Sequence, residues 1–109
     1  MPSIFNSVGS IESLDRVFEE SHTRPVLLFK HCNSCGISAY VFEQLSAING
    51  IINVVTVQQD RDISNTVAER LGIRHASPQA FVLFEGRPIY HATHYGIEPD
   101  KIENKLTNK

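Results

Sequence analysis

Residues 26–38 read VLLFKHCNSCGIS, and this stretch decides how the rest of the chain is interpreted. Pro25 ends any preceding helix, and the four residues from Val26 to Phe29 are all apolar. A run that is apolar on both faces indicates a strand in the middle of a covered sheet. Cys32 and Cys35, the two cysteines of the chain, follow this strand and precede a helical pattern. The stretch therefore predicts a strand, a loop with both cysteines and a helix in direct succession.

Hydrophobic periodicity and cap residues predict further strands and helices on either side of this stretch. The strands are expected at residues 26–29, 51–57, 80–84 and 89–93, and Pro88 makes the last of them an edge strand. The predicted helices run from a cap at Ser10 to Ser21, over 37–48, from Asp60 or Asp62 to Gly72, and from Pro99 onward.

The order of these elements predicts an α/β fold with a central mixed sheet and helices on both faces. Two βαβ passes with right-handed crossovers give parallel strands, and the hairpin at residues 85–87 adds antiparallel ones. In such sheets, ligand sites form beyond the carboxyl ends of the parallel strands. The loop from Cys32 to Cys35 is expected at that end of the sheet, which is where chemistry is predicted.

The composition is that of an ordinary globular domain and excludes several classes of partner. The 109 residues are 41% hydrophobic and 20% charged, with a net charge of −2. This balance favours neither nucleic acid nor an anionic membrane as partner, and no apolar run approaches the ~20 residues needed to span a bilayer. The first residues lack the pattern of a signal peptide. We therefore expect one domain over residues 1–109, a monomer in the cytosol.

The two cysteines support two interpretations. Cys32 and Cys35 form a C-x-x-C pair, whereas Cys35 and Ser38 form a C-x-x-S pair in which one thiol works alone. Ser34 is predicted to cap the helix, which puts Cys35 at its first position. Free backbone N–H groups and the helix dipole favour a thiolate there. Cys35 is therefore the predicted nucleophile, and Cys32 is a candidate resolving thiol.

Two other interpretations of the cysteines remain open at this point. A cysteine in the first turn of a helix can be a small buried apolar residue without reactivity. A metal site is the second alternative, because C-x-x-C supplies two ligands. Several histidines could complete it, but none has a zinc-ligand spacing to another: His31, His75, His91 and His94. We expect no metal.

The loop before the strand at 80–84 contains Ser77, Pro78 and Gln79, and this strand is expected beside the first apolar strand. Ser77-Pro78 could be an ordinary turn, since only about one X-Pro bond in twenty is cis. A cis bond would expose the backbone N–H and C=O of Ser77 near the nucleophile. An extended peptide or a thiol conjugate could pair with them as an added strand does.

The arrangement resembles the thioredoxin superfamily over nearly the whole chain and, within it, the monothiol bacilliredoxin-like family. Four segments match in order: residues 28–31, Cys35 with Ile37 and Ser38, residues 77–80 and residues 91–97. The resemblance implies a three-layer α/β/α fold, a nucleophile at Cys35 and a cis bond before Pro78. It also implies reduction of mixed disulfides between client proteins and bacillithiol, a sugar-based low-molecular-weight thiol. Bacillithiol would then be a co-substrate, and we expect no bound cofactor.

The family pattern also identifies expected substrate-binding residues, and it reveals two departures. The expected residues are Ser77, Pro78, Gln79, Lys30 and His94. The family has a proline where this chain has Gly36, and the position of Cys32 is usually not a cysteine. Cys32 therefore adds an intramolecular resolving step to a monothiol pattern.

Two alternative functions follow from the same residues. A dithiol reductase would cycle a disulfide between Cys32 and Cys35, as ordinary thioredoxins do with W-C-G-P-C. An iron–sulfur or adaptor module would use Cys35-Gly36-Ile37-Ser38, which is similar to the C-G-F-S of monothiol glutaredoxins. Their glycine-pair glutathione motif is missing from this chain, so a thiol–disulfide oxidoreductase is the expected enzyme.

Overall fold

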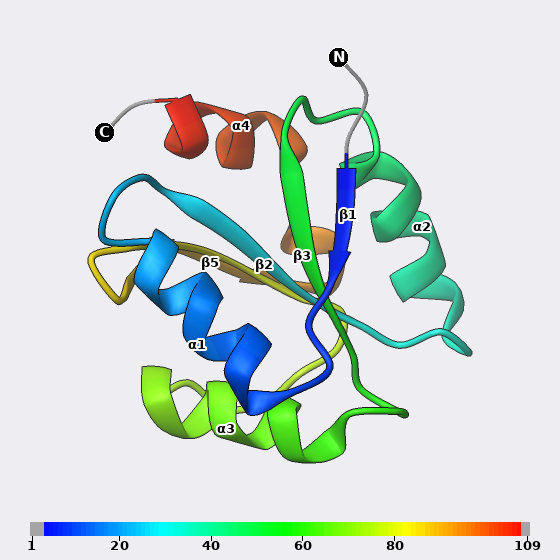
Figure 1. Cartoon of the computed structure of the whole chain (residues 1–109). Helices are drawn as coiled ribbons and strands as arrows, with labels where there is room; N and C mark the ends of the chain where they lie inside the picture. Colours follow the sequence, from blue (N-terminus) through cyan, green and yellow to red (C-terminus); the bar gives the residue numbers. More distant parts are fainter. Residues whose placement is uncertain (1–3, 108–109) are drawn as a thin grey trace.

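The computed structural model describes residues 4–107, which form a five-stranded mixed sheet between two layers of helices (Figure 1). The strands are β1 (Ile4–Ser7), β2 (Val26–His31), β3 (Ile51–Thr56), β4 (Gln79–Phe84) and β5 (Arg87–Thr93). The helices are α1 (Ile11–Glu20), α2 (Gly36–Leu45), α3 (Arg61–Leu71) and α4 (Pro99–Thr107), and a 3₁₀ turn, η1 (His94–Gly96), precedes α4. The predicted α/β architecture is confirmed.

The strands lie in the order β1-β3-β2-β4-β5, with β2 in the centre. β3 pairs with β1 and β2 in parallel, whereas β4 is antiparallel to both β2 and β5. The predictions of a central strand after Pro25 and of an edge strand at Pro88 are therefore confirmed. The prediction of a second parallel βαβ pass is wrong, because β4 begins beside the end of β2 and runs antiparallel to it. The pairing of Lys30 with Gln79 brings the end of β2 beside the start of β4, so the cysteine loop meets the Ser77-Pro78 loop.

The continuous apolar run of β2 is explained by cores on both faces of the sheet. Leu27 and Phe29 belong to the core that α2 and α4 cover, whereas Val26 and Leu28 belong to the core that α1 and α3 cover. Figure 1 shows these two helix pairs on opposite sides of the strands. Because successive side chains of a strand point to opposite faces, burial of both faces explains why the four residues from Val26 to Phe29 are all apolar.

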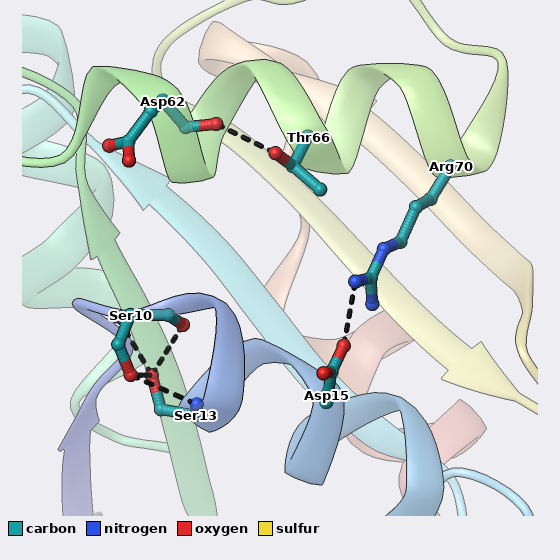
Figure 2. A network of polar contacts seen from close by, with 6 residues as sticks. All are labelled: Ser10, Ser13, Asp15, Asp62, Thr66 and Arg70. Carbon is teal, nitrogen blue, oxygen red and sulfur yellow. Dashed lines mark hydrogen bonds and ion pairs between the residues drawn. The ribbon is translucent and has the colours of Figure 1, made fainter.

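Two features of the helices agree with their sequence signals. Ser10 and Ser13 form a reciprocal cap at the start of α1 (Figure 2), in which the Ser13 N–H donates to Ser10 Oγ at 3.1 Å and the Ser10 N–H to Ser13 Oγ at 3.0 Å. α3 begins after Asp60 and ends at Gly72, which has a φ of 66°. Arg70 also ties α3 to α1 through an ion pair of 2.6 Å with Asp15.

Two predictions about element limits are wrong. β1 was not expected, because its four residues are exposed and show no alternation of buried and exposed positions. Its backbone pairing with β3 stabilises it instead. The cap of the helix after the cysteines lies one residue later than predicted: Cys35, not Ser34, is the N-cap, with an extended backbone at φ −110° and ψ 126°. The helix ends at Leu45, before the predicted limit at residue 48. Ser34 lies in a turn in which the Cys35 N–H approaches the Cys32 carbonyl at 3.4 Å.

β2 also carries a charged residue into the interior of the protein. The side chain of Lys30 is fully buried, and its Nζ lies 3.2 Å from Nδ1 of His75. No carboxylate forms an ion pair with Lys30 within residues 4–107. Burial lowers the pKa of Lys30 from 10.5 to about 8, because a desolvated ammonium is less stable than a solvated one.

No helix within residues 4–107 is long and apolar enough to cross a membrane.

The buried lysine predicts a dependence of stability on pH. Between pH 8 and about 10.5 the unfolded chain binds more protons at Lys30 than the folded protein does, so its contribution to stability rises with pH. We expect Lys30→Met to raise the free energy of unfolding at pH 7 by about 1–2 kcal/mol, because no charge is then buried. The gain should shrink as the pH approaches 10, as urea unfolding at several pH values would measure.

Lys105→Met is the matched control, because it removes an exposed lysine from α4. It should leave the pH dependence of wild type unchanged. A difference between wild type and Lys30→Met that stays constant from pH 7 to pH 10 would contradict the prediction.

Candidate functional site

The two cysteines are joined in a disulfide at the carboxyl end of β2, with their Cα atoms 5.5 Å apart. They differ in exposure. Cys35 is exposed at the N-cap of α2, whereas Cys32 is only 6% exposed. The backbone N–H groups of the first turn of α2 have no partner inside the helix, so they favour negative charge at its start. Cys35 is therefore the sulfur that a large substrate can reach.

Ser38 occupies the place where a C-x-x-C helix would carry its second sulfur. Its side chain is fully buried, and its Oγ accepts a hydrogen bond from the Cys32 N–H at 2.9 Å. The same oxygen lies 2.8 Å from Nδ1 of His31. Burial lowers the pKa of His31, whose ring lies 4.5 Å from that of Phe42. Ser38 therefore holds the cysteine loop on the helix as a structural residue.

Gln58 holds the other side of the same loop and was not expected from the sequence. Its Nε2 lies 3.0 Å from Cys32 Sγ and 2.9 Å from Ser34 Oγ, so one amide hydrogen can go to each. Its Oε1 accepts from the Asn33 N–H at 3.1 Å. A side-chain amide that donates to a sulfur stabilises that sulfur as a thiolate.

A signal for Gln58 existed in the topology. β2 and β3 are parallel, and His31 pairs with Thr56, so the residues that follow the two strands emerge side by side. Gln58 lies two residues after β3, opposite the cysteine loop after β2. The predicted parallel pairing could have indicated this region, but not which of its side chains faces the sulfur.

The second loop of the site precedes β4. The peptide bond between Ser77 and Pro78 is cis, and the Pro78 carbonyl accepts from the His94 N–H at 3.0 Å. Ser77 is half-buried, whereas His94 is exposed and adopts a φ of 53°. The structure therefore brings both of these expected substrate-binding residues to the same edge of the sheet as the cysteines, with η1 joined to the loop by its backbone.

Gln79, also expected to bind substrate, uses its side chain inside the protein. It is fully buried; its Nε2 donates to the Arg74 carbonyl at 3.0 Å and lies 3.0 Å from Nε2 of His91. Its Oε1 accepts from the Ala76 N–H at 3.3 Å. Burial lowers the pKa of His91, so a neutral imidazole accepts from the amide. Gln79 thus holds the loop from the inside, away from the position of a substrate.

Lys30, the remaining expected substrate-binding residue, reaches the site through His75. Nδ1 of His75 lies 3.2 Å from Nζ of Lys30 and 3.0 Å from Oγ of Ser64. The pKa of His75 is lowered by desolvation and by the positive charges of Lys30 and Arg61. His75 is itself exposed and therefore covers the buried amine. The neutral ring of His75, and not Lys30, forms this surface.

Two exposed tyrosines lie near each other on α2 and η1. Tyr40 on α2 and Tyr95 in η1 are exposed at 55% and 69%, with ring centroids 5.9 Å apart. Residues 4–107 contain no group of three or more His, Cys, Asp or Glu side chains that could hold a metal ion. The disulfide thus lies at the edge of the sheet that also carries the start of α2 and the cis-proline loop.

Comparisons with known proteins agree with this chemistry. The family described as monothiol bacilliredoxin BrxC matches residues 6–102. A solved structure described as a candidate oxidoreductase with a thioredoxin fold is 27% identical, with a TM-score of 0.85 over 94% of this chain and 93% of its own.

Thioredoxins share the fold at lower identity. The thioredoxin Mala s 13 of Malassezia sympodialis is 18% identical, with a TM-score of 0.72 over 98% of this chain and 90% of its own. Thioredoxin NaTrxh of Nicotiana alata is 16% identical, with a TM-score of 0.73 over 97% and 92%. The family match spans most of the chain, and the fold is the thioredoxin fold. The protein thus belongs to the monothiol bacilliredoxin family of thioredoxin-fold oxidoreductases.

Proposed function

We propose that this protein reduces mixed disulfides between client proteins and a low-molecular-weight thiol, bacillithiol, through Cys35. The observation that carries the proposal is the asymmetry of the pair: Cys35 is exposed at the start of α2, whereas Cys32 is buried. Ser38, the third residue of α2, stands where a C-x-x-C motif that starts at Cys35 would carry its second sulfur. Cys35 is therefore both the sulfur that a client protein can reach and the sulfur whose thiolate the start of the helix stabilises.

In the first step, the Cys35 thiolate attacks the sulfur of the small thiol in the mixed disulfide. The bond between the small thiol and the client breaks, and the client leaves as a thiolate that takes a proton from water. The exposed ends of α2 and η1, with Tyr40 and Tyr95, offer apolar surface for the client.

In the second step, the Cys32 thiolate attacks Cys35 Sγ. The small thiol leaves as a thiolate, and a disulfide forms between the two cysteines. Two observations support this step: the loop accommodates that disulfide, and Gln58 donates to Cys32 Sγ. A chain with this second cysteine would therefore release its small thiol without help from another molecule.

The substrate-binding residues divide into two kinds under this proposal. Ser77 and His94 would contact the thiol conjugate, and the buried Pro78 would do so only through its backbone, since all three lie at the edge of the sheet where the cysteines are. Gln79 and Lys30 would act through their neighbours, because both side chains are fully buried. We further propose that the protein works as a cytosolic monomer with the small thiol as co-substrate and without a bound cofactor.

A dithiol reductase is the second candidate, and the disulfide between Cys32 and Cys35 is the observation that favours it. In that case, the client itself carries an internal disulfide and no small thiol is transferred. Intact mass spectrometry of Cys32→Ala after reaction with a client separates the two functions. A bacilliredoxin gains the mass of one small thiol, whereas a dithiol reductase becomes linked to the client.

The two cysteines predict opposite behaviour of their variants on a bacillithiolated model protein. Cys35→Ala should lose transfer completely, because no other thiolate at the surface can attack. Cys32→Ala should keep the first transfer at a rate within about twofold of wild type and should accumulate the small thiol on Cys35. Quenched-flow mass spectrometry measures both. Activity of Cys35→Ala, or loss of the first transfer in Cys32→Ala, would contradict the assignment.

Removal of the Gln58 carboxamide is expected to slow the second step, the attack of Cys32 on Cys35. We expect Gln58→Ala to reduce the rate of disulfide formation between Cys32 and Cys35 by about fivefold, because the loop loses hydrogen bonds worth ~1 kcal/mol in net terms. The first transfer should remain unchanged. The rate of release of the small thiol from Cys35 is the measurement.

Gln59→Ala is the matched control for Gln58→Ala. Gln59 is the neighbouring glutamine and is exposed, and its backbone N–H binds the Thr56 carbonyl, an interaction that the substitution retains. Equal release rates in the two variants would show that the carboxamide of Gln58 has no role in the second step.

A further inference from the structure

A cavity of about 360 Å³ lies beside Cys32, between the first turns of α3 and the loop before β4. The polar residues that line it include Gln58, Arg61, Ser64, His75 and Ser77. Cys32 contributes to its wall, whereas Cys35 does not. The buried sulfur therefore has its own access, on a different side from the exposed sulfur at the start of α2.

The cavity is cationic. Arg61 forms no ion pair within residues 4–107, and none of the residues that line the cavity is acidic. Behind His75 lies the fully buried Lys30, whose ammonium has no carboxylate partner in this part of the chain. Two acidic residues, Asp60 and Asp62, flank Arg61 along the chain, but neither of them lines the cavity. The Asp60 carboxylate points toward Gly9 and lies 3.5 Å from the position that a Cβ there would occupy. Such a charge distribution fits an anion of small size.

We propose that this cavity binds a low-molecular-weight thiol that carries a carboxylate, with the carboxylate at Arg61 and the sulfur at Cys32. This inference rests on the proposed function, since it concerns how the disulfide formed in its second step is reduced again. It assigns the two sulfurs to different reactions. The mixed disulfide of a client reacts with Cys35 at the surface, whereas the free small thiol that reduces the protein disulfide reacts with Cys32 in the cavity.

Reduction of the disulfide between Cys32 and Cys35 consumes two molecules of the small thiol. The thiolate of the first attacks Cys32 Sγ, the bond between Cys32 and Cys35 breaks, and Cys35 leaves as a thiolate. The thiolate of the second attacks the outer sulfur of the adduct, forming the symmetric disulfide of the small thiol and leaving Cys32 as a thiolate. Two electrons pass from the two thiols to the protein disulfide.

The direction of attack agrees with the difference between the two leaving groups. A thiolate leaves faster when its negative charge is stabilised, and Cys35 at the N-cap of α2 faces the positive end of the helix. Attack at Cys32 expels this better leaving group. Attack at Cys35 would instead expel Cys32, which lines the cavity. The access route and the leaving-group chemistry therefore both favour attack at Cys32.

The test compares two thiols that differ in charge: 3-mercaptopropionate, which carries a carboxylate, and 2-mercaptoethanol, which carries a hydroxyl. Stopped-flow measurement of disulfide reduction in the oxidised full chain gives a rate constant for each, corrected for its thiolate fraction. We expect the carboxylate thiol to react about fivefold faster with wild type, as one charge-assisted contact at the exposed Arg61 would give. Arg61→Ala should abolish this preference.

Arg87→Ala is the matched control, since it removes an exposed arginine at the opposite end of β4 from the site. It should keep the wild-type preference. Equal rate constants for the two thiols with wild type, or an unchanged preference in Arg61→Ala, would overturn the proposed cavity. The transfer assay with Cys35→Ala and Cys32→Ala is independent of this result, so the two proposals can fail separately.

The position of attack has its own readout. After brief reaction with 3-mercaptopropionate, acid quenching and alkylation with N-ethylmaleimide, fragmentation mass spectrometry locates the small thiol and the alkyl group. We expect the small thiol on Cys32 and the alkyl group on Cys35. The reverse arrangement would overturn the assignment of the cavity to Cys32.

Discussion

Strand β2 pairs with β3 on one side and with β4 on the other, and both pairings are needed to assemble the site. The parallel pairing of His31 with Thr56 brings Gln58 to the cysteine loop, and the antiparallel pairing of Lys30 with Gln79 brings the cis-proline loop to it. A shift of either register by one residue would turn every β2 side chain to the other face of the sheet. That shift is disfavoured because it would exchange Leu27 and Phe29 with side chains that are close-packed in the core on the other face, so the packing of β2 determines the geometry around the sulfurs.

Within that frame, the cysteine loop is held from two directions by neutral groups. Ser38 binds the Cys32 N–H from the helix side, and Gln58 binds Asn33, Ser34 and the sulfur of Cys32 from the side of β3. A neutral hydroxyl at residue 38 keeps the loop in place without offering a second thiol on the helix. The second sulfur of this chain instead precedes the helix, where it is buried. The two sulfurs thus differ in exposure and in their neighbours, which is the physical basis for giving them different roles.

The sequence predicted those parts of the structure that depend on apolar pattern and on local caps. The run from Val26 to Phe29 identified the central strand, and Gly72 and Pro99 marked helix limits that the structure confirms. β1 was missed because its stability comes from pairing with β3, which leaves no pattern in four exposed residues.

The roles of Gln58 and His75 were missed for a related reason. Their contacts with Cys32 and Lys30 span 26 and 45 residues of chain. Only the assembled sheet brings these groups together, so a sequence signal limited to one segment cannot reveal them.

Lys30 shows where the requirements of the fold and of the site differ. Its position on β2 lies between Leu28 and Cys32 on the face toward α1 and α3, and an apolar side chain there would suit the core. The ammonium is buried with one neutral partner, so its desolvation is not offset by a carboxylate. The charge nevertheless contributes positive potential at the edge of the sheet where sulfur chemistry takes place, and a low-dielectric interior transmits that potential with little screening. A residue that weakens the core in this way is best explained by its electrostatic effect on its neighbours, His75 and the cationic cavity beside Cys32.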